Sequence, residues 1–241
     1  MKFLFKAVFF KPLYNLLVWL VVILPGHNVG LAVILLTILV RLVLFPLQHR
    51  MSKTQSTLRN LTPTINELKE KYKDNQSEQA RQLMVLYKEH GINPFVGFLS
   101  LLIQLPILIA LFLVFQQGFE FQSATLYAFI SAPPAVETLW LGINLTATSY
   151  VLAIMAGVTQ LIQGYFLKPT LTPQKNTTTQ SGFSQQLQHS LQLQVRYVMP
   201  VMIVIIALRL PAAIPLYWVT SNIFSIIHEA WVRRSTPQNH S

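Results

Sequence analysis

Five apolar stretches separated by polar segments constrain this chain of 241 residues more than any other feature. Four of them hold 18 to 21 residues, about the number that an α-helix needs to cross the hydrocarbon core of a bilayer. The fourth in order holds only 13, roughly 20 Å of helix, so we expect the bilayer around it to be thinned. The predicted class is therefore an all-α polytopic membrane protein with five transmembrane helices. The stretches are residues 30–47, 95–115, 150–167, 198–210 and 212–232.

Positive charges are concentrated in three of the polar segments. Residues 49–93 hold eight Lys or Arg against five acidic residues, and residues 168–196 hold three Lys or Arg and no acidic residue. The tail, residues 233–241, adds two arginines, whereas residues 118–149 contain two acidic residues and neither Lys nor Arg. By the positive-inside rule, the first three segments are cytoplasmic and residues 118–149 lie outside. The C-terminus is therefore predicted to be cytoplasmic.

One cation, Arg41, lies inside the first apolar stretch. A charge there costs roughly 2.5 to 3.5 kcal/mol on insertion scales, so it normally faces a wet cavity or a partner rather than lipid. Thr37 lies one turn earlier on the same helical face. Because Arg41 comes only five residues before Pro46, about 8 Å along a helix, we expect a hydrophilic pocket in the cytoplasmic half of the membrane.

Uncharged polar residues occur in the later stretches and could face this arginine. Taken singly, each is explained by an ordinary hydrogen bond between membrane helices. Taken together, they could line the pocket. They are Ser100 and Gln104 in the second stretch, Thr159, Gln160 and Gln163 in the third, and Thr220, Ser221 and Asn222 in the fifth.

The segment between the first two stretches, residues 51–90, is predicted to be a cytoplasmic helical hairpin. Thr62-Pro63 is typical of a helix start, and Asn75 with Glu78 resembles a capping box that opens a second helix. Gly91 is expected to end that helix. The hairpin is either a solvated connector or a docking arm. Residues 168–196, rich in Thr, Gln, Ser and Pro, are predicted to form a flexible cytoplasmic loop.

The chain lacks the residues that several classes of enzyme require. The chain has no cysteine and a single aspartate, Asp74, and His228-Glu229 is not followed by a second histidine at the spacing of a zinc motif. It also has no Gly-rich loop for a nucleotide. We therefore predict no enzymatic activity, no cofactor and no metal. The net charge of +10 lies beside the apolar stretches, which favours binding to anionic lipids, with ribosomal RNA as the alternative and no DNA.

Three stretches carry a specific pattern: residues 28–41 with the following Pro46-Leu47, residues 61–111 with the run Leu101-Leu102-Ile103-Gln104-Leu105-Pro106-Ile107, and Leu216-Tyr217-Trp218-Val219-Thr220-Ser221-Asn222. Together they resemble the YidC/Oxa-type membrane protein insertases, bacterial YidC-like members in particular. The resemblance extends from Pro12 to about Arg233.

The resemblance implies an insertase and chaperone of the bacterial plasma membrane. Its core, residues 28–232, would surround a hydrophilic groove that is open to the cytoplasm and centred on Arg41. The groove would accept hydrophilic flanks of nascent membrane proteins and release their apolar segments into lipid. The ribosome, a targeting receptor and a Sec-type translocon would be further partners. The implied client-binding residues are Arg41, Thr37, Gln104, Gln160, Tyr217, Trp218 and Asn222.

The N-terminal segment, residues 1–27, allows two placements. Lys6, Lys11 and Pro12 interrupt its apolar run, which favours an amphipathic helix lying in the membrane interface. The family pattern implies that this helix lies on the outer surface. Three lysines before residues 16–24 could instead anchor an additional span with its N-terminus inside.

A small-solute channel or transporter is the alternative function. It needs a pathway that opens to each side in turn and usually a repeated half with matching broken helices. The sequence shows no such repeat. A purely structural scaffold, the third option, gives no reason for tolerating Arg41.

Overall fold

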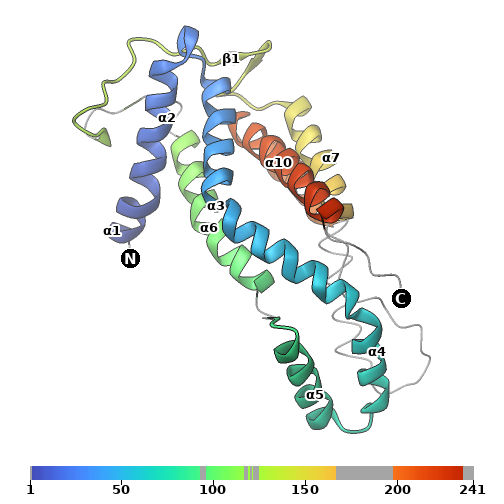
Figure 1. Cartoon of the computed structure of the whole chain (residues 1–241). Coiled ribbons are helices and arrows are strands. Elements are labelled where there is room, and N and C mark those ends of the chain that lie inside the picture. The colour runs from blue at the N-terminus through green and yellow to red at the C-terminus, as the bar shows by residue number, and fades with distance from the viewer. Residues whose placement is uncertain are drawn as a thin grey trace.

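The structure, a computed structural model, describes residues 2–92, 96–116, 119, 121, 125–166 and 198–235. The expected loop at residues 168–196 and the end of the tail lie outside the described residues. The described chain is mainly helical (Figure 1). Its long helices are α2 (Lys11–Ile23), α3 (Val29–Asn60), α6 (Val96–Gln116), α7 (Tyr150–Phe166) and α10 (Ala213–Ser235), and its shorter ones are α1 (Lys2–Phe5), η1 (Lys6–Phe10), η2 (Pro25–His27), α4 (Thr62–Lys71), α5 (Gln76–Glu89) and α9 (Met199–Ala207).

Each predicted span lies on a helix, but their lengths differ from the prediction. By length and composition, two helical segments in the described residues could cross a membrane, Lys6–Ile23 and Val29–Leu58. Gln104–Gln116 and Tyr150–Tyr165 are shorter apolar helices. In the fourth predicted span, residues 198–210, the described α-helix is α9, which ends at Ala207, four residues before Pro211.

The N-terminal helices form one continuous rod that returns along α3. The helices α1, η1 and α2 follow each other without a break from Lys2 to Ile23, and the rod contacts both α3 and α6. A tight turn at η2, in which Gly26 has a φ of 71°, reverses the chain into α3. Figure 1 shows α2 and α3 side by side. The expected interfacial helix is thus packed as part of the helical body.

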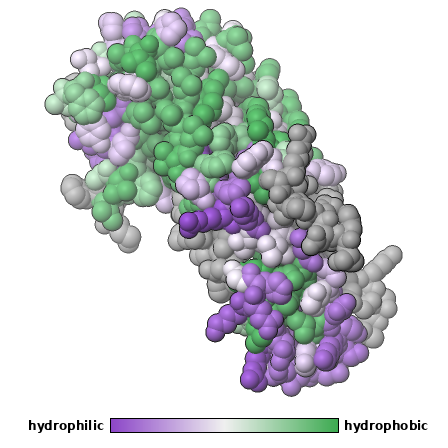
Figure 2. Space-filling view, in the orientation of Figure 1, coloured by the Kyte–Doolittle hydropathy of each residue, from purple (hydrophilic) through white to green (hydrophobic). Residues whose placement is uncertain are grey.

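The helix α3 joins this body to the hairpin. It runs for 32 residues, contains Pro46, and changes direction along its length (Figure 1). A proline inside a helix removes one backbone hydrogen bond and commonly bends the helix there. The C-terminal half of α3 therefore leaves the body and carries α4 and α5 away from it. Figure 2 shows hydrophobic side chains over the body and hydrophilic ones over the hairpin.

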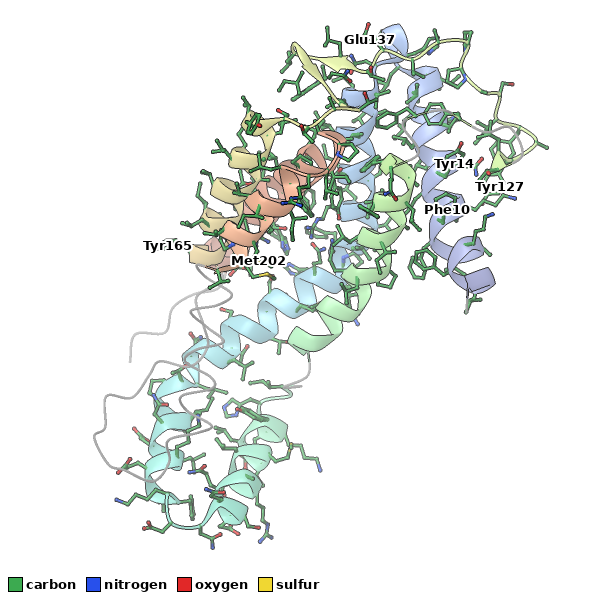
Figure 3. The ribbon with its side chains drawn as sticks, turned by 180° about the vertical axis from the view of Figure 1, so that it is seen from behind. Phe10, Tyr14, Tyr127, Glu137, Tyr165 and Met202 are labelled. Carbon is green, nitrogen blue, oxygen red and sulfur yellow. The ribbon has the colours of Figure 1, made fainter. Side chains whose placement is uncertain are left out.

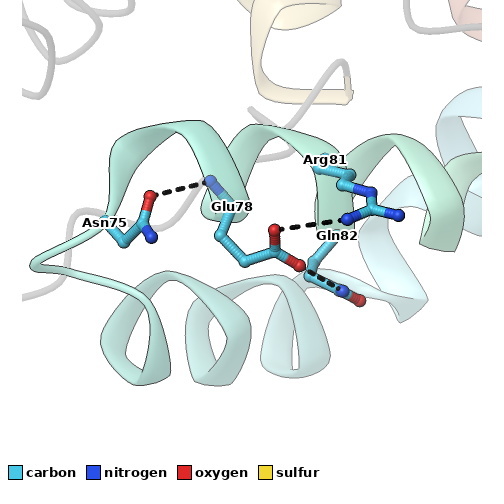
Figure 4. A network of polar contacts seen from close by, with 4 residues as sticks. All are labelled: Asn75, Glu78, Arg81 and Gln82. Atoms are coloured by element: carbon cyan, nitrogen blue, oxygen red, sulfur yellow. Dashed lines mark hydrogen bonds and ion pairs between the residues drawn. The ribbon is translucent and has the colours of Figure 1, made fainter.

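The hairpin has the helix ends that its sequence predicts. The helix α4 begins at Thr62, and the Asn75 side chain caps α5 by accepting a 3.0 Å hydrogen bond from the Glu78 backbone N–H (Figure 4). The Glu78 carboxylate in turn pairs with Arg81 at 3.7 Å. Gly91 follows α5 with a φ of 61°, which confirms its predicted role as the residue that ends the helix.

The hairpin helices bury a small seam of their own. Ile65 of α4 and Leu86 of α5 are both buried. Burial lowers the pKa of Lys69 and raises the pKa of Tyr87, because a low-dielectric environment disfavours the charged form of each group. The seam therefore gives the hairpin a defined shape even though its surface is charged.

A short β-hairpin covers the end of the body opposite to the helical hairpin. Its strands are β1 (Leu139–Trp140) and β2 (Ile143–Asn144), paired antiparallel. Trp140 packs on Gly30 so closely that a Cβ added to Gly30 would lie 2.2 Å from the Trp140 ring. The backbone N–H of Val29 donates to Glu137 at 2.9 Å. The chain between α6 and α7 is therefore fixed to the start of α3.

Close packing between α7 and α9 depends on one glycine. A Cβ at Gly157 would lie 2.3 Å from Val204 Cγ2 and 3.3 Å from the Pro200 carbonyl oxygen. Membrane helices use small residues in this way to approach each other. Gly164, two turns further along α7, has nothing within 4 Å of an added Cβ.

We predict that Gly157→Ala lowers the free energy of unfolding by about 1–3 kcal/mol, the usual cost of overpacking. Gly164→Ala, the matched control, should be neutral or stabilising by up to about 1 kcal/mol, because alanine favours helix. Equilibrium unfolding in mixed detergent micelles measures both. Equal effects of the two substitutions would contradict the packing described for Gly157.

Candidate functional site

The polar residues of the membrane body meet along one helix, α10. This helix packs against α3, α6 and α7. Its residues Tyr217, Ser221 and Asn222 are buried although all three are polar. Tyr217 and Ser221 are one turn apart and share a face of α10. Each of the three bonds to a different neighbouring helix.

Arg41 of α3 bonds to Ser221 of α10. Its Nε donates to the Ser221 hydroxyl oxygen at 3.0 Å, and its Nη2 donates to the same oxygen. The arginine is half-buried. Because the serine is neutral, these two bonds orient the guanidinium but leave its positive charge in place. Part of the side chain also stays accessible to an approaching group.

Gln104 of α6 bonds to Tyr217 of α10. The Gln104 amide donates to the Tyr217 hydroxyl at 2.9 Å, and Tyr217 is 2% exposed. Because Tyr217 and Ser221 share a face of α10, a chain of polar residues runs from α6 through α10 to Arg41 on α3.

Asn222 connects α10 to α7. Its Nδ2 donates to the Thr159 hydroxyl at 3.1 Å and lies 3.5 Å from the Ala156 carbonyl oxygen. The contact lies next in sequence to the one between Ser221 and Arg41. The helix α10 thus holds α3 and α7 by adjacent residues that point in different directions.

The other predicted site residues lie near this chain of contacts but form no part of it. Thr37 is buried, and its hydroxyl donates to the Val33 carbonyl of its own helix at 2.7 Å. Gln160 is half-buried on α7, one residue after Thr159. Trp218 is half-buried and packs against the hydrophobic core. The side chain of Ser100 lies outside the described residues.

Two residues of the polar chain, Ser221 and Thr159, are absent from the client-binding set that the resemblance implies. The sequence does carry a signal for Ser221, because it follows Tyr217 by four residues and therefore shares its helical face. Thr159 is expected only as one of the polar residues of the third apolar stretch that could line the pocket. Its role depends on where α7 lies against α10, and no spacing along the chain encodes that.

A cluster of rings lies at the end of the contact between α3 and α10 that faces the helical hairpin, about two helical turns beyond Arg41. His49 Nδ1 and His228 Nε2 lie 3.4 Å apart. Phe45 lies against His228 with ring centroids 4.9 Å apart, and Trp231 lies against His49 at 5.5 Å. His49 and His228 are 179 residues apart in the sequence, so no local pattern predicts their contact. In the described part of the chain, no group of three or more His, Asp or Glu is arranged to hold a metal ion.

Comparison with known proteins identifies the family. Residues 20–239 match the family described as 60Kd inner membrane protein. The chain belongs to this family. The match confirms the resemblance to YidC/Oxa-type proteins drawn from the three sequence stretches. It also shows that this is a family of inner membrane proteins.

Curated members of the family carry names that agree. The chain is 31% identical over 217 residues to "Membrane protein insertase YidC" of Clostridium tetani, covering 90% of this chain and 86% of that protein. It is 33% identical over 219 residues to "Membrane protein insertase MisCA" of Bacillus subtilis, covering 89% and 74%. It is 32% identical over 211 residues to the YidC insertase of Geotalea daltonii, covering 88% of this chain and 35% of that protein. The chain therefore spans about a third of the longer relatives, and the names describe insertion rather than an enzymatic reaction.

We predict that Gln104 and Tyr217 are energetically coupled. In a double-mutant cycle of Gln104→Leu and Tyr217→Phe, the coupling in the free energy of unfolding should be about 0.5–1 kcal/mol, the usual worth of a hydrogen bond between membrane helices. A cycle of Gln104→Leu with Ser225→Ala should show no coupling, because the Ser225 hydroxyl bonds within its own helix. Additivity in the first cycle would show that the hydrogen bond does not contribute to stability.

Proposed function

We propose that this protein is a membrane protein insertase whose working site is a hydrophilic groove around Arg41. The main support is the environment of Arg41. This cation is half-buried in an apolar helix, and it donates its hydrogen bonds to the neutral hydroxyl of Ser221. A guanidinium that keeps its charge in such a place costs free energy, so it is retained for a function. In this proposal, an acidic group of a client forms an ion pair with the guanidinium.

In the proposed mechanism, the hydrophilic flank of a new membrane protein enters the groove from the cytoplasm. Arg41 attracts acidic residues of the flank, because a charge-assisted hydrogen bond is stronger in a low-dielectric site than in water. Gln104, Tyr217 and Asn222 offer hydrogen bonds that replace part of the lost hydration. Thr37, Gln160 and Trp218 line the remainder of the groove in this proposal.

The short helix α9 lowers the remaining barrier. The apolar stretch that contains it, residues 198–210, corresponds to about 20 Å of helix, less than the roughly 30 Å thickness of the hydrocarbon core. The bilayer thins where a short apolar helix meets it, which shortens the path of the flank. Once the flank has crossed, the apolar segment of the client partitions into lipid. Burial at about 25 cal/mol per Å² then drives the reaction without nucleotide hydrolysis.

The cytoplasmic elements are proposed as docking sites. The hairpin α4–α5 projects from the membrane body and carries a charged surface (Figure 2), so it can present a binding face to the ribosome, a targeting receptor or a Sec-type translocon. The basic tail, proposed to be cytoplasmic, and the cations of the hairpin also suit anionic lipids. Five spans, α3, α6, α7, α9 and α10, form the core in this proposal.

A channel or transporter is a weaker candidate. Its pathway would have to open to both sides in turn. In the structure, the N-terminal end of α3 is fixed to Glu137 and covered by Trp140. In the proposed topology this end faces outside, which suits one-sided entry of a client from the cytoplasm better.

We predict that Arg41→Ala lowers insertion of a single-span client with an acidic external tail by at least about tenfold, since a hydrogen bond to a charged group is worth about 1.5–3 kcal/mol. Arg41→Lys should retain part of the activity, because it keeps the charge but loses the fork of donors. Insertion into reconstituted vesicles measures both variants.

A client with its acidic tail residues changed to amides is the matched control. Its insertion should depend much less on Arg41 than that of the acidic client. Unchanged insertion of the acidic client by the Arg41→Ala protein would contradict the charge-attraction step.

A further inference from the structure

The tip of the β-hairpin carries an exposed leucine in an unfavourable backbone conformation. Leu141 and Gly142 connect β1 to β2, and both have a positive φ, 49° and 79°. A two-residue turn with this backbone favours Asn-Gly, because most side chains, leucine included, are disfavoured in the left-handed region. Leu141 is also 83% exposed, the highest value among the large hydrophobic residues that the structure describes. In water, this residue has neither a backbone nor a burial advantage.

The hairpin directs its apolar side chains two ways. Trp140 packs on Gly30 of α3, as described above. Leu139 and Leu141 flank Trp140 in the chain, and side chains alternate between the two faces of a strand. Leu139 is accordingly 53% exposed. One aromatic side chain therefore contacts the membrane body, and two leucines point away from it.

The hairpin is held at one end of the membrane body. Its first strand is fixed to the start of α3 by the bond from Val29 to Glu137, and the chain after β2 is fixed to the start of α10, where the Ala213 N–H donates to the Leu145 carbonyl at 3.1 Å. Figure 3 shows Glu137 at this end of the body, well separated from Tyr165 near the other end of α7. The two leucines are therefore presented at a defined level of the body.

The start of α7 marks the same level as a membrane surface. This helix begins a few residues after β2 with Tyr150, which is 74% exposed, and tyrosine is enriched where a membrane meets water. Val151, Ile154 and Val158 follow at helical spacing and are 53–59% exposed. With α7 placed as a span, this stripe faces lipid. The leucines of the hairpin therefore lie near the edge of a lipid-facing surface.

The charge of the segment also suits contact with lipid. Residues 118–149 contain neither Lys nor Arg. Glu137 lies at the base of the hairpin, where its Oε1 accepts the Leu139 backbone N–H at 2.7 Å. The turn itself, Leu141 and Gly142, carries no charge that has to stay in water. An uncharged apolar tip can enter the boundary between headgroups and acyl chains.

We infer that Leu139 and Leu141 anchor the β-hairpin in the lipid surface at this end of the membrane body. Their side chains insert among the acyl chains just below the headgroups. A tip held in this way also keeps Trp140 on Gly30. The inference rests on the proposed placement of α7 as a span, and it is independent of client insertion.

Spin labels in reconstituted vesicles test the anchor, because the native chain has no cysteine. Leu141→Cys is compared with Ile154→Cys, a lipid-facing reference on α7, and with Asp74→Cys, an aqueous reference in the helical hairpin. Each label is exposed to oxygen, which concentrates in hydrocarbon, and to a water-soluble nickel complex. We expect the ratio of oxygen to nickel accessibility to be highest at position 154, intermediate at 141 and lowest at 74.

A ratio at position 141 equal to that at position 74 would show a tip in water and overturn the inference. Low accessibility to both reagents would show a tip covered by protein, either a second copy or another partner, and would also overturn it. An aqueous reading at position 154 would overturn the placement of α7 as a span, and the anchor with it. Client insertion enters none of these readings, so they leave the proposed insertase activity to its own test.

A second pair of variants separates anchoring from folding of the turn. With the label at Leu139→Cys, the added substitution Leu141→Asn suits the turn but removes the apolar side chain. We expect the ratio at position 139 to shift toward the aqueous value. Leu141→Met, which stays apolar, is the matched control and should leave the ratio unchanged. Equal ratios in the Asn and Met variants would show that Leu141 does not anchor the hairpin.

Discussion

The hydrogen bonds between Arg41 and Ser221 are the interaction on which the membrane body depends. They connect α3 to α10, and the adjacent contacts of Tyr217 and Asn222 extend the connection to α6 and α7. In hydrocarbon, an unsatisfied polar group costs several kcal/mol, so each of these bonds restricts how the helices can be arranged. A neutral partner orients the arginine without cancelling its charge. Structure and proposed function thus use the same side chain.

The sequence predicts the helices well because apolar length, proline and capping residues act locally. The position of α10 and the ends of α4 and α5 follow from such signals. Arg41 could be identified as a site residue from the sequence alone, because placing a charged side chain in an apolar stretch costs free energy.

Contacts between helices could not be predicted in the same way. The bond from Asn222 to Thr159, the pair His49 and His228, and the packing of Trp140 on Gly30 all join residues far apart in sequence. They depend on the rotation of each helix about its axis, which a single sequence does not encode. For the N-terminal rod, the sequence leaves two placements open, and its contacts with α3, α6 and Tyr127 could not be predicted from local patterns.

The central claim, that Arg41 meets the hydrophilic flank of a client, is tested most directly by photocrosslinking. A photoreactive amino acid at position 41 is combined with a ribosome-tethered nascent membrane protein, and the same amino acid at Val43, which is 78% exposed on α3, serves as the control. The account predicts that position 41 crosslinks to the acidic flank of the client and that position 43 crosslinks mainly to lipid. Crosslinks from position 41 to lipid or to neighbouring helices alone would contradict it.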